Sequence, residues 1–383
     1  MNQVIVFGTG VVAYGVIDEC AKAGLHVIHL TTKRDDIAAV SGHIDERAFV
    51  EFEAASESDL LAYFLTSAAR WNGAMLLPVN DRHVVFVARH LEALSEAYGC
   101  CVQPWTTLKE IVNKNRLYWH AHEIDVPAPK ILEITKTSDL NSLKHWSDYP
   151  CIIKPFQTPD FFEEFGQKVH VVNNHDEAKS KLEITLSLGL DVMVSEIIPG
   201  PEDSLHTYAT CLDANGQVIA EAYTRKVRQD NDYGVASVIR TIEPVAEVRD
   251  MCLRLLRHFS YRGLAVVEVK KDVRDDTFKL IEINARPVLY HRLFGKAGLN
   301  ITKILNNDLR AVPVEMGVHA RPGMYWMHNL SEIYALKRYL ISRNLRIRDF
   351  FRPYFRPHIM ALPAFRDWRP LVALIKKYFG AKS

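Results

Sequence analysis

Two apolar stretches near residue 280 constrain the fold more than any other feature of the chain. The stretches LAVVEVKKD and KLIEINARP flank the short polar turn VRDDT, and we expect them to pair as a β-hairpin. In this pairing Glu268 lies opposite Glu282, and Asn284 and Arg286 follow on the second strand. Like charges directly opposite each other on one face of a sheet destabilise it. The hairpin therefore predicts a cation held between the two carboxylates.

The residue types around this acidic pair indicate which cation. Glu282 and Asn284 are two positions apart, so their side chains share one face of the strand. Glu268, Glu282 and Asn284 all offer oxygen donors, which suit Mg²⁺, and Mg²⁺ usually binds together with substrate phosphates. We therefore expect a phosphorylated ligand near the hairpin.

Length and composition limit the class of protein. The 383 residues are enough for two or three domains with sizeable cores. The apolar runs are too short to span a bilayer, and no basic segment precedes the apolar N-terminal strand as in a signal peptide. The six cysteines show neither zinc spacing nor a secreted disulfide pattern. We expect a cytoplasmic protein without a transmembrane segment.

Strand and helix patterns alternate over residues 1–105. The strands NQVIVF, HVIHL, AMLLPV and CCVQP are separated by helical patterns, of which the last runs from Asp81 to Tyr98. This alternation predicts a doubly wound parallel α/β domain.

The pattern changes after residue 105. We expect a helix over 107–123, which ends before DVPAP because residues preceding proline leave helical space. Mostly antiparallel strands follow, with helices near 175–189 and 245–260. We expect an α+β domain over 106–312 and a basic, mostly helical extension over 313–383.

Two lysines and one strand break are candidate contacts for the phosphorylated ligand. Lys154 lies late in the apolar strand CIIKPF, where a lysine is unusual unless it is paired. Lys114 lies in the helical segment VNKNRLYW. Each alone is an ordinary solvated lysine, but together with the acidic hairpin they indicate a phosphate site. The segment MVSEIIPGPEDSL is either an ordinary turn or a strand break whose backbone meets a planar ligand, with Glu202 on a ribose hydroxyl.

The order Lys114, Lys154, EIIPGPE, LAVVEV and IEINARP resembles the ATP-grasp superfamily from about residue 105 to 310. The N-terminal α/β unit resembles the domain that usually precedes this fold. Within the superfamily the chain is most similar to the carboxylate–amine ligases that include D-aspartate ligase. The VNK element, the long loop after Lys154 and the extended C-terminal tail carry this finer resemblance.

The resemblance implies a nucleotide site. Lys114 and Lys154 would contact the α- and β-phosphates of ATP, and Lys168 would close over them from the loop. Glu196 and the backbone of Ile197 and Ile198 would meet the adenine, and Glu202 the ribose.

The resemblance also implies metal and catalytic residues. Glu268, Glu282 and Asn284 would bind two Mg²⁺ ions, for which Mn²⁺ can substitute. Arg286 would steady the γ-phosphate or an acyl phosphate. The basic residues that are candidates for holding the substrate carboxylate are Arg225, Lys226 and Arg228.

The implied activity is an ATP-dependent ligase that activates a small-molecule carboxylate as an acyl phosphate and joins it to an amine. ADP and phosphate are released. One departure concerns the loop PFQTPDFFEEFG, in which Gly166 is the only glycine, whereas many relatives have a glycine-rich phosphate loop. Whether this loop closes over the phosphates stays open.

Two alternatives remain open from the sequence. The turn GTGVVA (Gly8 to Ala13) has the spacing of a dinucleotide fingerprint, and Lys33 and Arg34 could meet the 2′-phosphate of an NADP-dependent oxidoreductase. The chain could also be a catalytically inactive ATP-binding module.

The C-terminal extension is strongly basic. Residues 321–383 hold 13 lysines and arginines and three acids, a net charge of +10, so the remainder carries −9. Its helices either pack on the ATP domain or present an anionic partner with a binding surface. A homodimer is also expected from the resemblance. The interpretation of the extension as a surface for an anionic partner is based on the arginines Arg346, Arg348, Arg352 and Arg356 beside the aromatic residues Phe350, Phe351, Tyr354 and Phe355.

Overall fold

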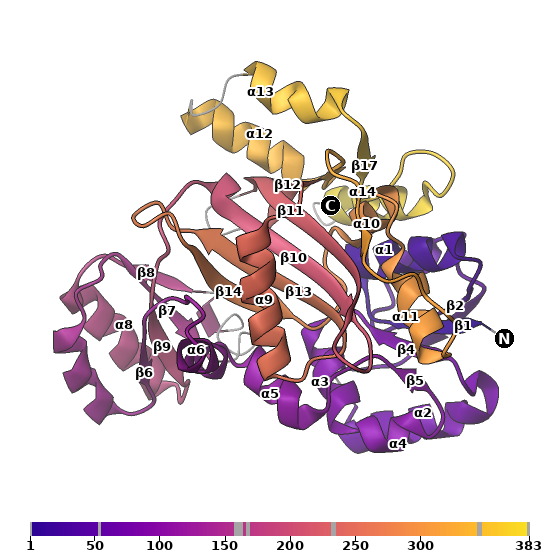
Figure 1. Ribbon diagram of the computed structural model, residues 1–383, viewed down its shortest axis with the longest axis horizontal. Helices are drawn as coiled ribbons and strands as arrows, with labels where there is room; N and C mark the ends of the chain where they lie inside the picture. Colours follow the sequence, from indigo (N-terminus) through magenta and orange to yellow (C-terminus); the bar gives the residue numbers. More distant parts are fainter. Residues whose placement is uncertain are drawn as a thin grey trace.

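The described residues of the computed structural model form three β-sheets with helices packed on and between them (Figure 1). The small antiparallel sheet lies at one end and the parallel N-terminal sheet at the other, with the large sheet between them (Figure 1). The structure describes residues 2–52, 55–156, 164–165, 169–230, 235–342 and 347–380.

The N-terminal sheet is parallel throughout and has the order β3-β2-β1-β4-β5. Helices α2 and α3 begin where the sequence supplies caps, because the side chains of Ser56 and Asn80 accept hydrogen bonds from the backbone N–H groups of Asp59 and His83. The doubly wound prediction is confirmed. The helix expected from Asp81 to Tyr98 is instead two helices that meet at His90, and β3 was not expected. The elements are β1 (Gln3–Phe7), α1 (Gly10–Lys22), β2 (His26–Thr31), η1 (Ala38–Val40), β3 (Glu46–Phe49), α2 (Glu57–Trp71), β4 (Met75–Pro78), α3 (Asp81–Arg89), α4 (Leu91–Ser95) and β5 (Gly99–Cys100).

The small sheet has the order β6-β9-β7-β8 and packs against α8. Two helices precede it instead of the single helix expected over 107–123. The side chain of Asn113 causes the break, since it accepts hydrogen bonds from the N–H groups of Asn115 and Arg116 and so caps a new helix that begins at Lys114. The elements are α5 (Trp105–Val112), α6 (Lys114–Glu123), β6 (Ile131–Ile134), η2 (Thr137–His145), β7 (Cys151–Pro155), β8 (His170–Val172), α8 (His175–Ser187) and β9 (Val192–Glu196).

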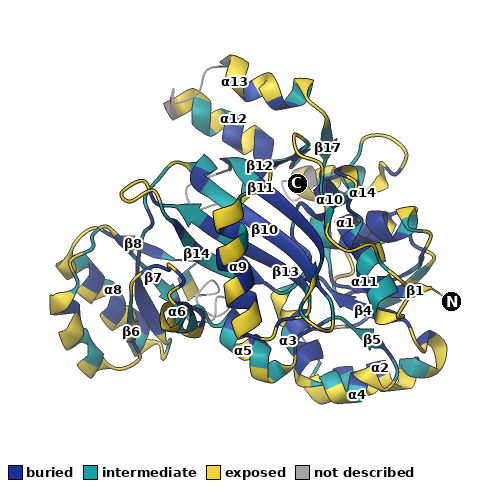
Figure 2. Cartoon of the chain, viewed as in Figure 1, coloured by how far each residue is buried: buried dark blue, intermediate teal, exposed yellow. Residues whose placement is uncertain are grey.

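The large sheet runs in the order β14-β13-β10-β11-β12-β16-β17, and β15 pairs with β11. Side chains that alternate along its strands pack into two different cores. Val266 packs in the core with α1, α10 and α11, whereas Val267 packs in the core with α6 and α9. Buried residues run along these strands (Figure 2). The elements are η3 (Glu202–Ser204), β10 (Leu205–Leu212), β11 (Val218–Gln229), β12 (Ala236–Thr241), α9 (Ala246–His258), β13 (Gly263–Lys271), β14 (Phe278–Asn284), α10 (His291–Lys296) and α11 (Ile301–Leu309).

The C-terminal extension is helical, as expected, but it also adds strands to the large sheet. β16 pairs with β12 through Ile239 and Trp326, so the chain returns to the sheet after α11. No helix in the described part of the chain is both long and apolar enough to span a membrane. The domain boundaries at 105 and 312 stay predictions. The elements are β15 (Val318–His319), β16 (Tyr325–Met327), α12 (Ser331–Ser342), α13 (Ile347–Phe351), η4 (Arg352–Phe355), β17 (His358–Met360) and α14 (Arg369–Gly380).

Candidate active site

The acidic hairpin forms as the sequence predicts. Strands β13 and β14 pair with Glu268 directly opposite Glu282. The next pair is Val269 with Leu280, so Ile281 is an extra residue, and its carbonyl oxygen accepts a hydrogen bond from the Tyr118 hydroxyl at 2.7 Å. Such a bulge bends a strand and redirects side chains, and bulges often lie beside active sites. Here the bulge directly precedes Glu282.

The two carboxylates have different electrostatic environments. Burial and the neighbouring charge of Glu282 raise the pKa of Glu268 to about 7. The ammonium of Lys114, 2.8 Å from Oε2 of Glu282, lowers the pKa of that carboxyl. The Asn284 amide donates to Oε1 of Glu282 at 3.1 Å, which leaves its own oxygen available. Two carboxylates and one amide oxygen therefore converge, a donor set that fits Mg²⁺.

Lys154 lies beside this acidic pair on β7. Its Nζ atom is 3.2 Å from the Tyr118 hydroxyl and 4.9 Å from the centre of the Tyr118 ring. Burial and the charge of Lys114 lower the pKa of Lys154 to about 7. The environment thus disfavours the ammonium form in the absence of an anion, and a bound phosphate would reverse this effect.

The structure brings together Lys114, Lys154 and the acidic pair from four separate elements, α6, β7, β13 and β14. Tyr118 joins them, because it contacts Lys154 and β14 at once. The sequence reading missed Tyr118, although it lies four residues after Lys114 and so on the same face of α6.

The adenine-side candidates already have partners within the chain, which the sequence did not predict: the backbone N–H of Lys130 and the side chains of Arg274 and Lys270. The buried Glu196 accepts a hydrogen bond from the N–H of Lys130 at 3.0 Å and forms an ion pair with Arg274. The carbonyl oxygen of Ile198 accepts from Lys270 at 2.8 Å, and Ile197 is partly exposed. Their contact with adenine stays a prediction.

Glu202, the predicted ribose contact, is held by the C-terminal extension. Arg338 on α12 forms an ion pair with it, and the hydroxyl of Tyr339 donates to Oε2 at 2.6 Å. The N–H of Gln229 donates to the same oxygen at 3.2 Å. A ribose hydroxyl would therefore either share the Glu202 carboxylate with Arg338 and Tyr339 or displace these two side chains from the carboxylate.

The predicted substrate-binding basic residues separate into two groups. Arg228 is 2% exposed, and its guanidinium donates to Glu332 of α12 at 2.6 and 3.2 Å, so it points into a buried ion pair. Arg225 pairs with Asp203 at 2.5 Å. Lys226 is the nearer to the acidic pair, since its charge opposes the rise in the Glu268 pKa that burial causes. The ammonium of Lys226 donates a hydrogen bond to Oε1 of Gln229 at 3.1 Å, and the contact of any of the three with a substrate stays a prediction.

Arg286 connects β14 to the N-terminal domain. Its guanidinium donates to both carboxylate oxygens of Asp81, at the start of α3, at 2.6 and 2.9 Å. The guanidinium is close enough to Glu268 and Glu282 to favour their ionised forms. Lys168 and most of its loop lie outside the described residues.

The N-terminal GTGVVA turn gives no support to the NADP alternative. The N–H of Gly10, at the start of α1, donates to Oδ1 of Asp36 at 2.8 Å. A carboxylate of the chain therefore occupies the helix end where a dinucleotide phosphate would bind.

Comparisons with known proteins agree with this architecture. No protein-family model matches the chain. D-aspartate ligase of Enterococcus faecium is 22% identical over 246 residues, which cover 61% of this chain and 58% of that protein. The chain thus spans less than two thirds of the curated relative that it matches.

Solved structures show the same fold. L-amino acid ligase from Bacillus licheniformis superposes with a TM-score of 0.64 at 16% identity, covering 82% of this chain and 75% of that one. The biotin carboxylase domain dimer of Hydrogenobacter thermophilus 2-oxoglutarate carboxylase, in complex with MgADP, ADP and bicarbonate, gives 0.66 at 16% identity, covering 85% and 73%. The chain therefore has the ATP-grasp fold that its motifs predicted, and part of its sequence is similar to that of D-aspartate ligase.

Proposed function

We propose that the protein is an ATP-dependent carboxylate–amine ligase. The observation that carries the proposal is the convergence of Lys114, Lys154 and the pair Glu268 and Glu282 on one place between the small and large sheets. Cationic groups that meet phosphates stand next to oxygen donors that suit a divalent ion, as phosphoryl transfer requires.

The proposed chemistry starts from the repulsion between two anions. A substrate carboxylate oxygen attacks the γ-phosphate of ATP, the bond to the β-phosphate oxygen breaks, and ADP leaves. The amine then attacks the acyl carbon, loses a proton, and phosphate leaves. Bound Mg²⁺ supplies charge neutralisation on the phosphates, held by Glu268, Glu282 and Asn284. Two ions, with Mn²⁺ as a substitute, are the expected complement.

The residues of the chain have separate roles in this scheme. Lys114 and Lys154 bind the α- and β-phosphates, and Lys168 covers them. Arg286, fixed by Asp81, faces the transferring phosphoryl group. Lys226 orients the substrate carboxylate, and Arg228 does so only if its pair with Glu332 opens.

The nucleoside binds at the junction of the two sheets. Ile197 and Ile198 offer backbone groups to the adenine, beside Glu196. Glu202 accepts from the ribose at the border with α12, where Arg338 adjoins it. The fold resemblance to amino-acid ligases suggests an amino acid as one of the two substrates.

Four further properties belong to this proposal. The six cysteines are unpaired, which suits the cytoplasm. A homodimer is proposed because one solved relative with the fold is a dimer. The substrates are small molecules, and the basic extension binds an anionic partner.

A phosphate-release screen over pairs of carboxylates and amines tests the proposal. We expect phosphate and ADP only when a matching acid and amine are both present, with the amide identified by mass spectrometry. The variant Glu282→Gln serves as the inactive control. Nucleotide binding without ADP formation for any pair would instead favour an inactive ATP-binding module.

A further inference from the structure

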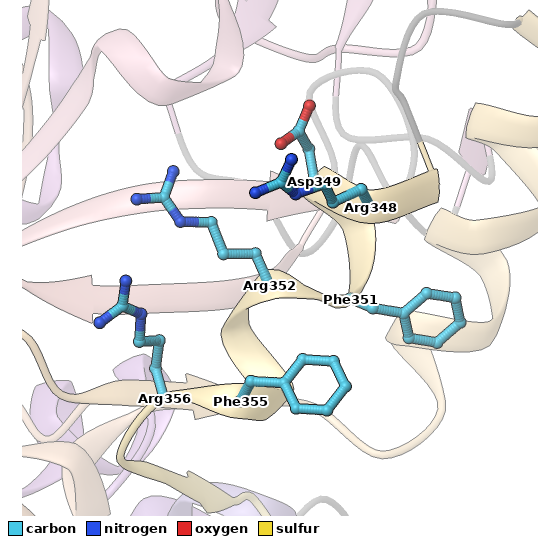
Figure 3. A pocket seen from close by; sticks show the side chains of 6 residues that line it. All are labelled: Arg348, Asp349, Phe351, Arg352, Phe355 and Arg356. Carbon is cyan, nitrogen blue, oxygen red and sulfur yellow. The ribbon is translucent and has the colours of Figure 1, made fainter.

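The segment that runs from α13 into η4 has a basic side and an apolar side. Arg348, Arg352 and Arg356 extend their guanidinium groups to one side, and the rings of Phe351 and Phe355 extend to the other (Figure 3). These residues line an open recess of about 690 Å³. Phe351 is 42% exposed and Phe355 is 85% exposed. Large exposed rings of this kind mark interaction surfaces when they gather in one place.

The segment that carries these exposed rings is itself packed against the rest of the protein. Phe350, directly before Phe351, is buried, and its ring lies under the Arg228 guanidinium, 4.2 Å from carbon to ring centre. Pro353 is also buried, and the Tyr354 hydroxyl donates to Glu332 at 3.1 Å. The segment is therefore held on the large sheet by Phe350, Pro353 and Tyr354, and Phe351, Arg352, Phe355 and Arg356 stay exposed.

The positive charge of the segment is not neutralised by its surroundings. Within the described residues, no ion pair or side-chain hydrogen bond engages the guanidinium groups of Arg348, Arg352 or Arg356. The acids of the extension mostly face inward instead. Glu332 pairs with Arg228, and Asp367 is 3% exposed.

The buried acids leave an excess of positive charge on the outer surface. Asp367 accepts hydrogen bonds from the Ser41 hydroxyl at 2.5 Å and from the N–H of Gly42 at 3.0 Å, so it fixes the extension to the N-terminal domain. Asp349 is the one exposed acid of residues 321–383. The outer face of the extension therefore attracts anions.

Exposed apolar side chains continue along the extension beyond this segment. Every phenylalanine that is exposed within the described residues lies here. Figure 2 shows exposed stretches along α12, α13 and the loop before α14. The further exposed side chains are Ile333, Tyr334, Leu340, Ile341, Phe365, Trp368, Ile375 and Tyr378.

We propose that this face docks on an anionic lipid bilayer. A bilayer surface offers phosphates to the arginines and an apolar interior to the rings, which matches a segment whose basic and apolar sides are separate. A second copy of the chain would present the same positive charge and be repelled. Single-stranded nucleic acid stacks its bases on rings inside a basic groove, whereas here the rings point away from the arginines.

Flotation with lipid vesicles tests the proposal on the full chain. The protein is mixed at low salt with vesicles of phosphatidylcholine alone or with about one third phosphatidylglycerol, in the absence of ATP. We expect binding to the anionic vesicles only, and weakening at high salt. The assay measures no catalysis, so its result is independent of the proposed ligase activity.

Variants identify the surface. Replacing Arg348, Arg352 and Arg356 by Gln should reduce vesicle binding on the order of a hundredfold. The double variant Phe351→Ser and Phe355→Ser should reduce it about tenfold or more. The residues are exposed, so thermal unfolding should be unchanged in both variants.

Matched controls lie on other faces of the molecule. The exposed Arg254 and Arg257 on α9 are changed to Gln, and the exposed Trp119 on α6 is changed to Ala. These controls should bind vesicles as the wild type does. Absence of vesicle binding, or equal losses in the controls, would overturn the proposal. Binding to single-stranded RNA without binding to vesicles would also overturn it and assign the surface to nucleic acid.

Discussion

The Nζ atom of Lys114 lies 2.8 Å from Oε2 of Glu282, although the two residues are 168 positions apart in the chain. This contact lowers the pKa of Glu282, whereas burial raises the pKa of its neighbour Glu268 to about 7. One carboxylate of the acidic pair is thus balanced by a lysine, and the other holds a proton near neutral pH. A divalent ion would displace that proton.

The raised pKa of Glu268 predicts a pH-dependent stability. Because its folded-state pKa lies above the ordinary value of 4.5, Glu268 contributes stability below about pH 4.5, and this contribution is lost as the pH rises through about 7. The variant Glu268→Gln should therefore gain stability relative to the wild type between about pH 5 and about pH 8.

Urea unfolding at the two pH values measures this gain. The contribution of Lys154 to stability has the opposite pH dependence. Because the folded-state pKa of Lys154 is lowered to about 7, the free energy of unfolding rises as the pH increases from about 7 to 10.5. The comparison of wild type and variant at each pH cancels the Lys154 contribution. A stability difference that is the same at both pH values would contradict the environment assigned to Glu268.

Lys154→Gln should weaken ATP binding about 10- to 100-fold, because a charge-assisted hydrogen bond to phosphate contributes about 1.5–3 kcal/mol. Isothermal titration calorimetry with ADP and ATP measures the effect. The exposed Lys144 lies on η2, which precedes β7 in the chain. The control variant Lys144→Gln should bind nucleotide as the wild type does. Equal nucleotide affinities in the Lys154 variant and the control would remove Lys154 from the phosphate site.

Glu282→Ala should reduce ATP turnover at least about 10²- to 10³-fold while the protein stays folded, because a group that holds the metal at the phosphates is lost. Coupled detection of ADP with a matching acid and amine measures turnover, and circular dichroism verifies the fold. Retained turnover in this variant would refute the role of Glu282 at the metal site.

Glu332→Ala should lower the free energy of unfolding by about 3–5 kcal/mol, because it leaves the buried Arg228 without its partner. Chemical unfolding measures the loss. The exposed Glu315 provides the control Glu315→Ala, for which a change within about 0.5 kcal/mol is expected. The double variant Arg228→Met with Glu332→Leu should recover much of the stability. A single variant as stable as the wild type would mean that the extension is not anchored by this pair.

The local patterns of the chain predicted much of the fold. The strands and helices of residues 1–105 alternate with clear periodicity, and their parallel sheet formed as expected. The register of Glu268 with Glu282 followed from one short turn, because few residues separate the two strands. The short strands β3, β6 and β12 were not predicted, and the break at Asn113 depends on one side-chain cap.

The contacts made by the C-terminal extension could not be predicted from the sequence. The resemblance makes Arg228 a candidate for holding the substrate carboxylate, and in the structure Arg228 forms a buried ion pair with Glu332. Its partner Glu332 is 104 positions away, and Arg338 reaches Glu202 over 136 positions. Such pairs depend on tertiary packing, and no spacing rule in a single sequence indicates them.

Binding of Mn²⁺, followed by electron paramagnetic resonance with and without ADP, tests the central claim most directly. The comparison uses the wild type, the double variant Glu268→Gln with Glu282→Gln, and the control Asp276→Asn in the exposed turn of the same hairpin. We predict that the wild type and the control bind Mn²⁺ together with the nucleotide, and that the double variant does not. Undiminished nucleotide-dependent Mn²⁺ binding in the double variant would contradict a metal site between these carboxylates.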